Sequence, residues 1–237
     1  MLLYYIRHGD PIYNPDSLTE LGHKQAKALV ERTSLNGFDE IYCSTSMRAQ
    51  MTAQPTCERL KKEKILLDWT NEAYVYEEFG LKDENGVHNW AFFQPKYLEK
   101  FTSEEVLTFG KKWYEHPDFK TLSFRAGVER VDRETDEFLL SLGYKHDREH
   151  NRYEIVNGNE KRVALFAHHG FGIAFLSSVL DIPYPLFAAH FDFMLSCVSV
   201  IKFEERNGFA YAKVLQLSND SHLFKAGIST EYNGVKI

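Results

Sequence analysis

The sequence predicts an α/β fold, a three-layer α/β/α sandwich with a mostly parallel central sheet and a mainly helical inserted cap. Short apolar segments at 2–6 and 163–167 each lead directly into histidine and glycine, and apolar segments alternate with segments of helical periodicity. Parallel strands have this continuous apolar character because helices cover both of their faces. The cap is predicted because residues 73–125 interrupt the alternation.

The first predicted strand, residues 2–6, leads into Arg7, His8 and Gly9 at an edge of the sheet. Ligands bind beyond the carboxyl ends of the strands in such sheets, so His8 lies where chemistry is expected. Gly9 permits a sharp turn of the backbone, and Arg7 adds a permanent cation with a forked set of donors. The three residues together indicate a nucleophile beside an anion-binding group.

The residues that follow resemble a known family. Asn14 comes six positions after His8, and the segment 18–26 has the pattern Leu-Thr-Glu-x-Gly-x-x-Gln-Ala. Together with the Arg-His-Gly triplet, they resemble the histidine phosphatase superfamily, the phosphoglycerate-mutase-like proteins. The resemblance implies that Asn14 takes part in binding a phosphoryl group.

A helix is predicted to end near Thr33, and Ser17 and Glu20 at its start have the spacing of a capping box. A turn signal follows, and residues 39–44 are predicted to form the second short strand. This order places the first helix beside the first strand.

Arg48 lies in the first turn of the helix that follows the second strand. It repeats the position of Arg7 just past a strand end. The surrounding pattern Ser-x-x-x-Arg-Ala-x-x-Thr-Ala resembles the superfamily's second phosphate-binding arginine. Pro55 lies inside this helix and predicts a kink, because an interior proline removes a backbone hydrogen bond.

Glu72 follows the third predicted strand, residues 64–69. A carboxylate just past a strand end, in a site otherwise rich in cations, is where a general acid would be placed. The superfamily's acid commonly lies after this strand in a Leu-x-Glu-like context, which Trp69-x-x-Glu72 matches approximately. Glu77 and Glu78 follow closely, so the identity of the acid stays open between three carboxylates.

Residues 73–125 hold Trp90, Trp113 and many Phe and Tyr, with charged residues interspersed. One interpretation is a small helical subdomain with an aromatic core of its own. Another is a lid that selects the substrate, and the two are compatible because insertions over an active site often do both. We expect a single domain, 1–237, with 73–125 as a cap over the active site.

Residues 126–142 carry apolar side chains at helical spacing, and a glycine ends the predicted helix. The charged segment 144–156 comes next and is predicted to be a solvated hairpin. It contains His146 and His150, four residues apart, but no third ligand of fitting spacing accompanies them. No metal site is predicted.

The segment 162–170 repeats the pattern of the N-terminus, with an apolar strand that ends in His168, His169 and Gly170. It resembles the superfamily's second histidine motif, and in that alignment His168 takes the histidine position while His169 replaces the first glycine. Alternation favours the same choice, since neighbours on a strand point to opposite faces and only one can face His8. His169 is expected to contribute a backbone N–H or to line the pocket rim.

Near the C-terminus, residues 198–203 and 209–215 are predicted to form an antiparallel hairpin around an Asn-Gly turn. The segment 219–223 resembles the superfamily's closing segment, in which we expect His222 to be structural. His190 lies in an aromatic stretch, and its role stays open.

Composition excludes several classes of partner. The net charge is −6 and no basic run compensates for it, which argues against a nucleic-acid or anionic-membrane binder. No apolar segment reaches the roughly 18 residues of a membrane span, and no leader is expected ahead of the first strand. The three cysteines have no paired or metal-ligand spacing, so free thiols and a cytoplasmic location are expected.

The resemblance implies a phosphatase that acts through a phosphohistidine intermediate. The cationic residues make a metal unnecessary, and the aromatic-rich segment 73–125 suits a small organic or sugar phosphate. His8 is then the nucleophile, Glu72 the general acid and later the base, and His168, in its protonated form, a further catalytic donor. No cofactor is expected. Five residues are expected to surround the phosphoryl oxygens: Arg7, Asn14, Arg48, His168 and His169.

Two alternatives stay open at this point, a phosphoglycerate-type phosphomutase and a catalytically silent protein that binds a phosphorylated ligand. The residues after Glu72 lack the Arg-x-Tyr-Gly context that grips a phosphoglycerate, which favours hydrolysis over phosphoryl transfer. The presence of Arg7, His8, Arg48 and His168 argues against a silent protein. The sequence does not determine the oligomeric state.

Overall fold

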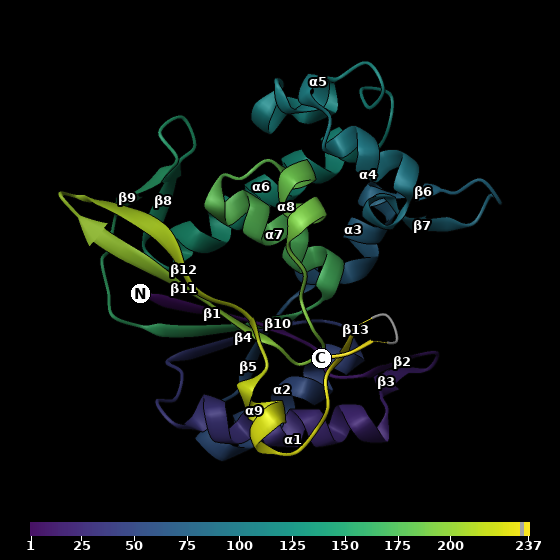
Figure 1. Ribbon diagram of the computed structural model, residues 1–237. Helices are drawn as coiled ribbons and strands as arrows, with labels where there is room; N and C mark the ends of the chain where they lie inside the picture. Colours follow the sequence, from purple (N-terminus) through teal and green to yellow (C-terminus); the bar gives the residue numbers. More distant parts are fainter. Residues whose placement is uncertain (233–234) are drawn as a thin grey trace.

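A central sheet organises the structure, a computed structural model that describes residues 1–232 and 235–237. Its strands are β1 (Leu2–Arg7), β4 (Glu40–Ser44), β5 (Lys64–Leu67), β8 (Tyr144–Asp147), β9 (Arg152–Ile155), β10 (Arg162–Ala167), β11 (Val198–Arg206) and β12 (Phe209–Asn219). They lie in the order β5-β4-β10-β1-β11-β12-β9-β8 (Figure 1).

The sheet is mostly parallel, as predicted. β1, β10, β4 and β5 pair in parallel, and antiparallel pairing adds β11, β12, β9 and β8. Among the described strands of this sheet, β11 and β9 run against the others. The two hairpins expected from the sequence, around 144–156 and 198–215, are therefore extensions of the same sheet.

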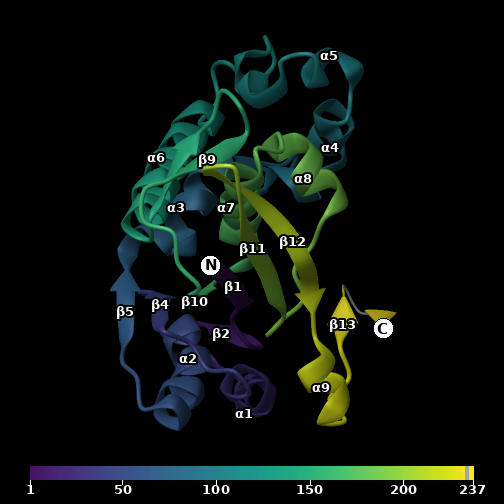
Figure 2. The same cartoon turned by 90° about the vertical axis from the view of Figure 1, so that its left-hand side faces the viewer.

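Helices cover both faces of the sheet, which confirms the three-layer α/β/α arrangement (Figures 1 and 2). On one face lie α1 (Glu20–Ser34), α2 (Met47–Leu60) and α9 (Ser221–Lys225). On the other lie α3 (Glu72–Phe79), α6 (Phe124–Ser141), α7 (His169–Leu180) and α8 (Tyr184–His190).

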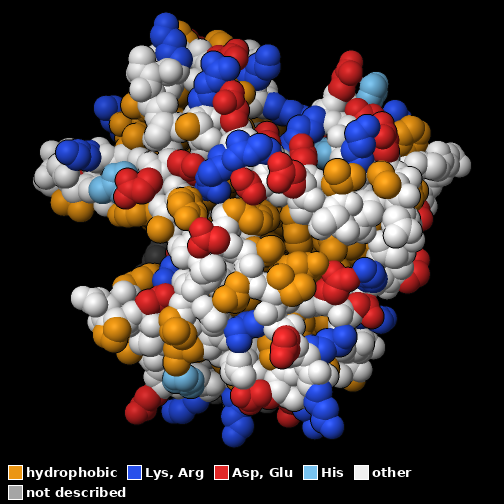
Figure 3. Space-filling view, turned by 180° about the vertical axis from the view of Figure 1, so that it is seen from behind, with side chains coloured by type: hydrophobic (Ala, Val, Ile, Leu, Met, Phe, Trp, Pro, Cys, Tyr) orange, Lys and Arg blue, Asp and Glu red, His pale blue; other side chains and the backbone are white. Residues whose placement is uncertain are grey.

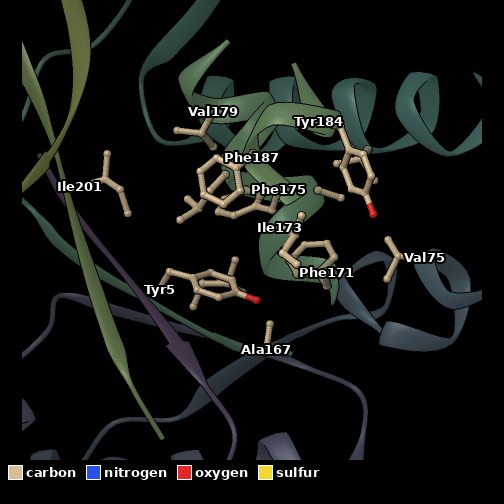
Figure 4. Packing of buried hydrophobic residues seen from close by; sticks show 14 of the residues in the cluster. Tyr5, Val75, Ala167, Phe171, Ile173, Phe175, Val179, Tyr184, Phe187 and Ile201 are labelled. Carbon is tan, nitrogen blue, oxygen red and sulfur yellow. The ribbon is translucent and has the colours of Figure 1, made fainter. Parts of the chain in front are cut away.

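The strand sequences explain the two covered faces. In β1, Leu3 and Tyr5 belong to one buried apolar cluster, while Ile6 belongs to another with Leu29 of α1. Successive side chains of a strand point to opposite faces, so a continuous apolar strand fills both cores. Figure 4 shows the larger core, in which the Tyr5 ring lies 5.8 Å from that of Phe175 on α7.

The start of the first helix differs in detail from the prediction. Residues 11–18 form a small hairpin of β2 (Pro11–Tyr13) and β3 (Asp16–Leu18), so Ser17 belongs to a strand. Thr19 is the N-cap of α1, and its hydroxyl accepts the backbone N–H of Gly22 at 3.0 Å. The capping box predicted from Ser17 is therefore wrong, because Ser17 pairs with Ile12 in the β2–β3 hairpin.

Residues 73–125 form mainly helical structure, as predicted for the cap. They contain most of α3, then β6 (Gly80–Lys82), β7 (His88–Trp90), η2 (Ala91–Phe93), α4 (Pro95–Phe101), α5 (Glu104–Leu107) and η3 (Gly110–Glu115). The rings of Phe101, Trp113 and Phe124 lie 5.0–5.8 Å apart. Tyr184 of α8 stacks on Trp113 at 5.6 Å, so the aromatic core of this segment continues into the main core.

The remaining elements are short. η1 (Asp68–Thr70) follows β5, while β13 (Glu231–Tyr232) pairs with β14 (Val235–Lys236) near the C-terminus. α2 continues through Pro55 without an interruption of the helix. Within residues 1–232 and 235–237, none of the helices has the length and apolar character needed to cross a bilayer.

The β8–β9 hairpin is solvated at His150, but the prediction is wrong for His146. The His146 side chain is fully buried, with Nδ1 2.9 Å from Oδ1 of Asp136 on α6. Its Nε2 lies 2.8 Å from Oδ2 of Asp181, which follows α7. Charge patterning could not reveal this burial, because it results from the packing of β8 against α6.

Both nitrogens of His146 face carboxylate oxygens, which only accept hydrogen bonds when ionised. Burial alone would lower the pKa of His146, but hydrogen bonds to Asp136 and Asp181 outweigh it and raise that pKa above its usual range. The ring is therefore held as an imidazolium between two carboxylates.

Candidate active site

The two strand-end histidines lie together. β1 and β10 are parallel neighbours with Arg7 opposite Ala167, so the residue after each strand, His8 or His168, reaches the same edge of the sheet. Their ring centroids are 5.3 Å apart, and both side chains are buried. The predicted juxtaposition follows directly from parallel pairing in this register.

His8 carries its proton on Nδ1 and its lone pair on Nε2. Its Nδ1 lies 2.7 Å from the carbonyl oxygen of Gly9, which can only accept, so Nδ1 carries the proton. Nε2 then accepts from Nε of Arg48 at 3.3 Å. Burial, followed by the charges of Arg7 and Arg48, lowers the pKa of His8 well below its usual range. The imidazole is neutral at pH 7, as a nucleophile requires.

Arg48 lies in the first turn of α2, as predicted, and its guanidinium contacts three groups. Besides Nε to His8, Nη2 lies 3.2 Å from Oε2 of Glu72 and Nη1 lies 2.9 Å from Oδ1 of Asp16. The Tyr13 ring centroid lies 5.4 Å from its Cζ. Arg48 thus joins the nucleophile candidate to a carboxylate candidate.

Glu72 is the first residue of α3 and lies among the strand ends. Its Oε1 accepts the backbone N–H of Gly170 at 2.8 Å, and its Oε2 lies 3.7 Å from Nδ1 of His168. Glu77 is exposed, and Glu78 is paired with Arg130 of α6 at 2.6 Å. Of the three carboxylates left open by the sequence, Glu72 is the one beside His8 and His168.

His168 is anchored by two serines and by backbone contacts. Its Nε2 lies 2.8 Å from Oγ of Ser44 and 3.2 Å from Oγ of Ser46. Tyr5 accepts the backbone N–H of His168 at 3.1 Å, and Figure 4 shows its hydroxyl directed toward the end of β10 at Ala167.

The protonation expected for His168 differs from the structure. Burial, then the neighbouring His8, Arg48 and Arg7, lower the pKa of His168 well below its usual range, so the ring is neutral at pH 7. Its buried Nδ1 has no hydrogen-bond partner among the described residues.

Arg7 and His169, the next two predicted residues, are held by contacts outside the group of His8, Glu72 and His168. Arg7 donates to the carbonyl oxygen of Phe193, and its buried Nε has no partner among residues 1–232 and 235–237. The His169 ring is paired with Asp192 and stacks on Phe93 at 5.9 Å. His169 is thus held beside His168 by contacts with Asp192 and Phe93.

Asn14 is exposed in the turn between β2 and β3. Within the described chain it makes no hydrogen bond to the other candidate residues. His222 is buried and faces Ser196 at 3.1 Å, which is consistent with a structural role.

Sequence reasoning missed Asp16, Ser44, Ser46 and Tyr5. Ser44 and Ser46 had a detectable signal, because they flank the end of β4, next to the strand that carries His168. Asp16 had none, since its contact with Arg48 spans 32 residues and depends on how the β2–β3 hairpin folds over α2.

The family follows from a sequence comparison. The family model of the histidine phosphatase superfamily (branch 1) matches residues 3–137. The chain belongs to this superfamily. The match confirms the predicted family and the enzyme class, a phosphatase. His168 lies beyond the matched segment, so its assignment rests on its position beside His8.

Solved structures confirm the fold. A phosphoserine phosphatase from Entamoeba histolytica, in complex with 3-phosphoglyceric acid, is 19% identical over 94% of this chain and 98% of its own, with a TM-score of 0.58. A putative α-ribazole-5'-P phosphatase from Escherichia coli is 21% identical over 93% of this chain and 98% of its own, also with a TM-score of 0.58. A mycobacterial glucosyl-3-phosphoglycerate phosphatase is 17% identical over 92% of this chain and 98% of its own, again with a TM-score of 0.58.

At these identities the likeness is one of fold. No curated protein sequence is significantly similar to this chain.

Residues of the 73–125 segment contact the two residues that follow His168. Trp90 packs directly against Gly170, where any Cβ would collide with the indole, and Phe92 lies 5.6 Å from the His169 ring. Seen from behind, the surface is hollowed at one edge between two projections, which match the β6–β7 and β2–β3 hairpins of Figure 1 (Figure 3). The carboxyl end of β1 points toward this edge.

His8, Glu72 and His168 also form a group that could hold a metal ion, since one ligand atom from each lies within 4.8 Å of the others. Two histidines and a carboxylate are a donor set that zinc accepts. However, the Arg48 guanidinium already lies against both His8 and Glu72, and a second cation there would be repelled in a buried setting. The donor set fits a metal, but the surrounding charge disfavours it.

Proposed function

We propose that the chain is a metal-independent phosphomonoesterase that acts through a phosphohistidine on His8. The observation that carries the proposal is the grouping of His8, Glu72 and His168, whose ligand atoms lie within 4.8 Å of one another, with Arg48 in contact with both His8 and Glu72. A neutral nucleophile, a carboxylate and fixed cationic donors are the parts that phosphoryl transfer through histidine needs.

In the first step, Nε2 of His8 attacks phosphorus and the P–O bond to the alcohol breaks. Glu72 gives its proton to the departing oxygen. In the second step, Glu72 takes a proton from water, the water oxygen attacks phosphorus, and the P–N bond breaks to release phosphate and free His8. The same carboxylate serves both steps because the second reverses the proton transfer of the first.

The phosphoryl oxygens would be held by Arg7, Arg48 and His168, with Asn14 and His169 at the edge. Buried donors fixed before reaction stabilise the developing charge without reorganisation. The unpartnered Nε of Arg7 and Nδ1 of His168 support this role, because a buried polar atom without a partner is costly unless a ligand satisfies it. Uptake of a phosphoryl dianion would also favour protonation of His168.

For the substrate we propose a small organic or sugar phosphate bound beneath residues 73–125, which act as a cap within a single domain, 1–237. The contacts of Trp90 with Gly170 and of Phe93 with His169 support this placement, since they seal one side of the site. The cytoplasm is the proposed location, supported by three cysteines that are free and buried.

Rapid quench with a ³²P-labelled phosphomonoester tests the proposal. One acid-labile phosphoryl group per chain should be trapped, and the His8→Ala variant should trap none. Turnover should survive EDTA, because Arg7 and Arg48 supply the positive charge that a metal would otherwise supply. Acid-stable label, full turnover in His8→Ala, or strict dependence on added Zn²⁺ would each contradict the proposal. Delivery of the label to an alcohol instead of water would indicate a mutase.

A further inference from the structure

Asp16 bridges the β2–β3 hairpin to the start of α2. Its Oδ1 lies 2.9 Å from Nη1 of Arg48, and its Oδ2 accepts the backbone N–H of Met47 at 2.7 Å. The two contacts fall on adjacent residues of the helix that carries the phosphate-binding arginine. No role in catalysis follows for Asp16 from the mechanism above.

The backbone contact replaces a missing cap. Ser46 is the N-cap of α2 and has extended backbone angles, but its side chain makes no capping hydrogen bond. Its hydroxyl lies 3.2 Å from Nε2 of His168 instead. A helix start leaves N–H groups that need acceptors, and a carboxylate is a favourable one. Asp16 satisfies the Met47 N–H from outside the helix, and Ser46 is free to hold His168.

The contact with Arg48 determines where the guanidinium lies. Arg48 has two carboxylate partners, Asp16 on one side and Glu72 on the other, while its Nε faces His8. The Arg48 side chain is 11% exposed and the Asp16 side chain 32% exposed, so solvent screens their contact less than it would between two fully exposed side chains. Without Asp16 the cation would have Glu72 as its single carboxylate partner. It would then shift toward Glu72 and away from His8.

We propose that Asp16 is a positioning residue, which holds the Arg48 guanidinium between His8 and Glu72 in the geometry that phosphoryl transfer needs. The proposal rests on the proposed function of His8 and Arg48. Asp16 touches neither the nucleophile nor the acid and acts through Arg48. The same short hairpin carries Tyr13, whose ring covers Arg48, so the hairpin as a whole fixes this side chain.

A double-mutant cycle between Asp16 and Arg48 tests the proposal. With p-nitrophenyl phosphate, Asp16→Ala should lower kcat/KM by roughly 10–10²-fold, the cost of a displacement of about 1 Å in a catalytic group. Arg48→Ala should lower it by roughly 10²–10³-fold, as loss of one fixed donor does. The double variant should match Arg48→Ala within about threefold, because residues that act through one another are not additive.

The control is Asp118→Ala, which removes an exposed carboxylate paired with Lys100 in the cap. It should leave kcat/KM unchanged. If the effect of Asp16→Ala came merely from the loss of an ion pair, Asp118→Ala would lower kcat/KM as well. Thermal unfolding of each variant shows how much stability the helix cap contributes. A fall in melting temperature with less than a twofold change in kcat/KM would reduce Asp16 to a structural role and overturn the proposal.

Binding of inorganic phosphate, measured by calorimetry, separates this proposal from the proposed function. Asp16→Ala should weaken phosphate binding in the wild-type background and have no effect in the Arg48→Ala background. Tighter binding would mean that Asp16 merely competes with anions for Arg48, and multiplicative losses in the cycle would mean that it acts elsewhere. Either outcome overturns the role of Asp16. Turnover retained by His8→Ala would instead reject the phosphohistidine mechanism. Phosphate binding would still show whether Asp16 positions Arg48, because that measurement does not depend on the reaction.

Discussion

The buried His146 offers a direct test of the packing between β8 and the helices above it. Replacement by phenylalanine keeps a flat ring of similar shape but removes both charge-assisted hydrogen bonds, to Asp136 and Asp181. Each such bond contributes about 1.5–3 kcal/mol. Asp136 keeps Arg148 at 2.8 Å and Asp181 keeps Lys111 at 2.6 Å, so neither carboxylate is left without a cation. We therefore take the lower value for each of the two bonds and expect the free energy of unfolding to fall by about 3 kcal/mol.

For a chain of this size, a loss of about 3 kcal/mol lowers the melting temperature by roughly 6–12 °C. Differential scanning calorimetry of wild type and His146→Phe measures it. The matched control is His150→Phe in the same hairpin, whose side chain is 56% exposed and paired with Asp147. An exposed pair contributes little, so the control should leave the midpoint nearly unchanged.

The same variant carries a signature in pH. Hydrogen bonds to two carboxylates raise the folded-state pKa of His146 above the unfolded value of about 6.5. The stabilisation is therefore complete below about pH 6.5 and is lost as the pH rises through the folded-state pKa. The stability difference between wild type and His146→Phe should be largest near pH 6 and should shrink toward pH 9. A difference that is constant over this range, or no larger than that of His150→Phe, would refute the imidazolium assignment.

Two further predictions concern the chemistry. Glu72→Gln should reduce turnover of an alkyl phosphate by roughly 10²–10⁴-fold and affect formation of phospho-His8 from p-nitrophenyl phosphate much less, because a good leaving group needs no acid. Equal losses with both substrates, together with a selective loss in Glu77→Gln, would reject Glu72 as the acid. Burial and the nearby Arg7 hold the pKa of His8 well below its usual range, so kcat/KM for p-nitrophenyl phosphate should stay level from pH 7.5 to pH 6. A fall of roughly fourfold by pH 6 would show that His8 titrates like an ordinary histidine with a pKa of about 6.5.

Several features of this protein could be predicted from the sequence because they depend on residues close together in the chain. His8 and His168 each follow an apolar strand, and parallel strands bring their carboxyl ends to one edge of a sheet. Arg48 lies at a strand-to-helix junction, which local patterns indicate well. The long helices, the hairpins around 144–156 and 198–215, and the aromatic content of residues 73–125 follow from periodicity and composition in the same way.

Other features were decided by contacts between distant segments. Our proposal of Glu72 over Glu77 and Glu78 rests on α3 beginning beside Gly170, and on Arg130 of α6 pairing with Glu78. All three carboxylates follow the same strand without another strand in between, and the motif around Glu72 is only an approximate match. Only the register of α3 against α7 and α6 separates them.

His146 and Asp16 show the physical reason most clearly. His146 and His150 share one charged hairpin, yet one is buried between two carboxylates and the other is exposed, because only one side of β8 packs against α6. Asp16 looks like an ordinary turn residue until the hairpin folds over α2 and brings it to Arg48. Local sequence determines which residues stand at strand ends and helix starts, through steric and periodic rules. Burial, ion pairing and protonation are properties of the surroundings, and the tertiary structure alone supplies those.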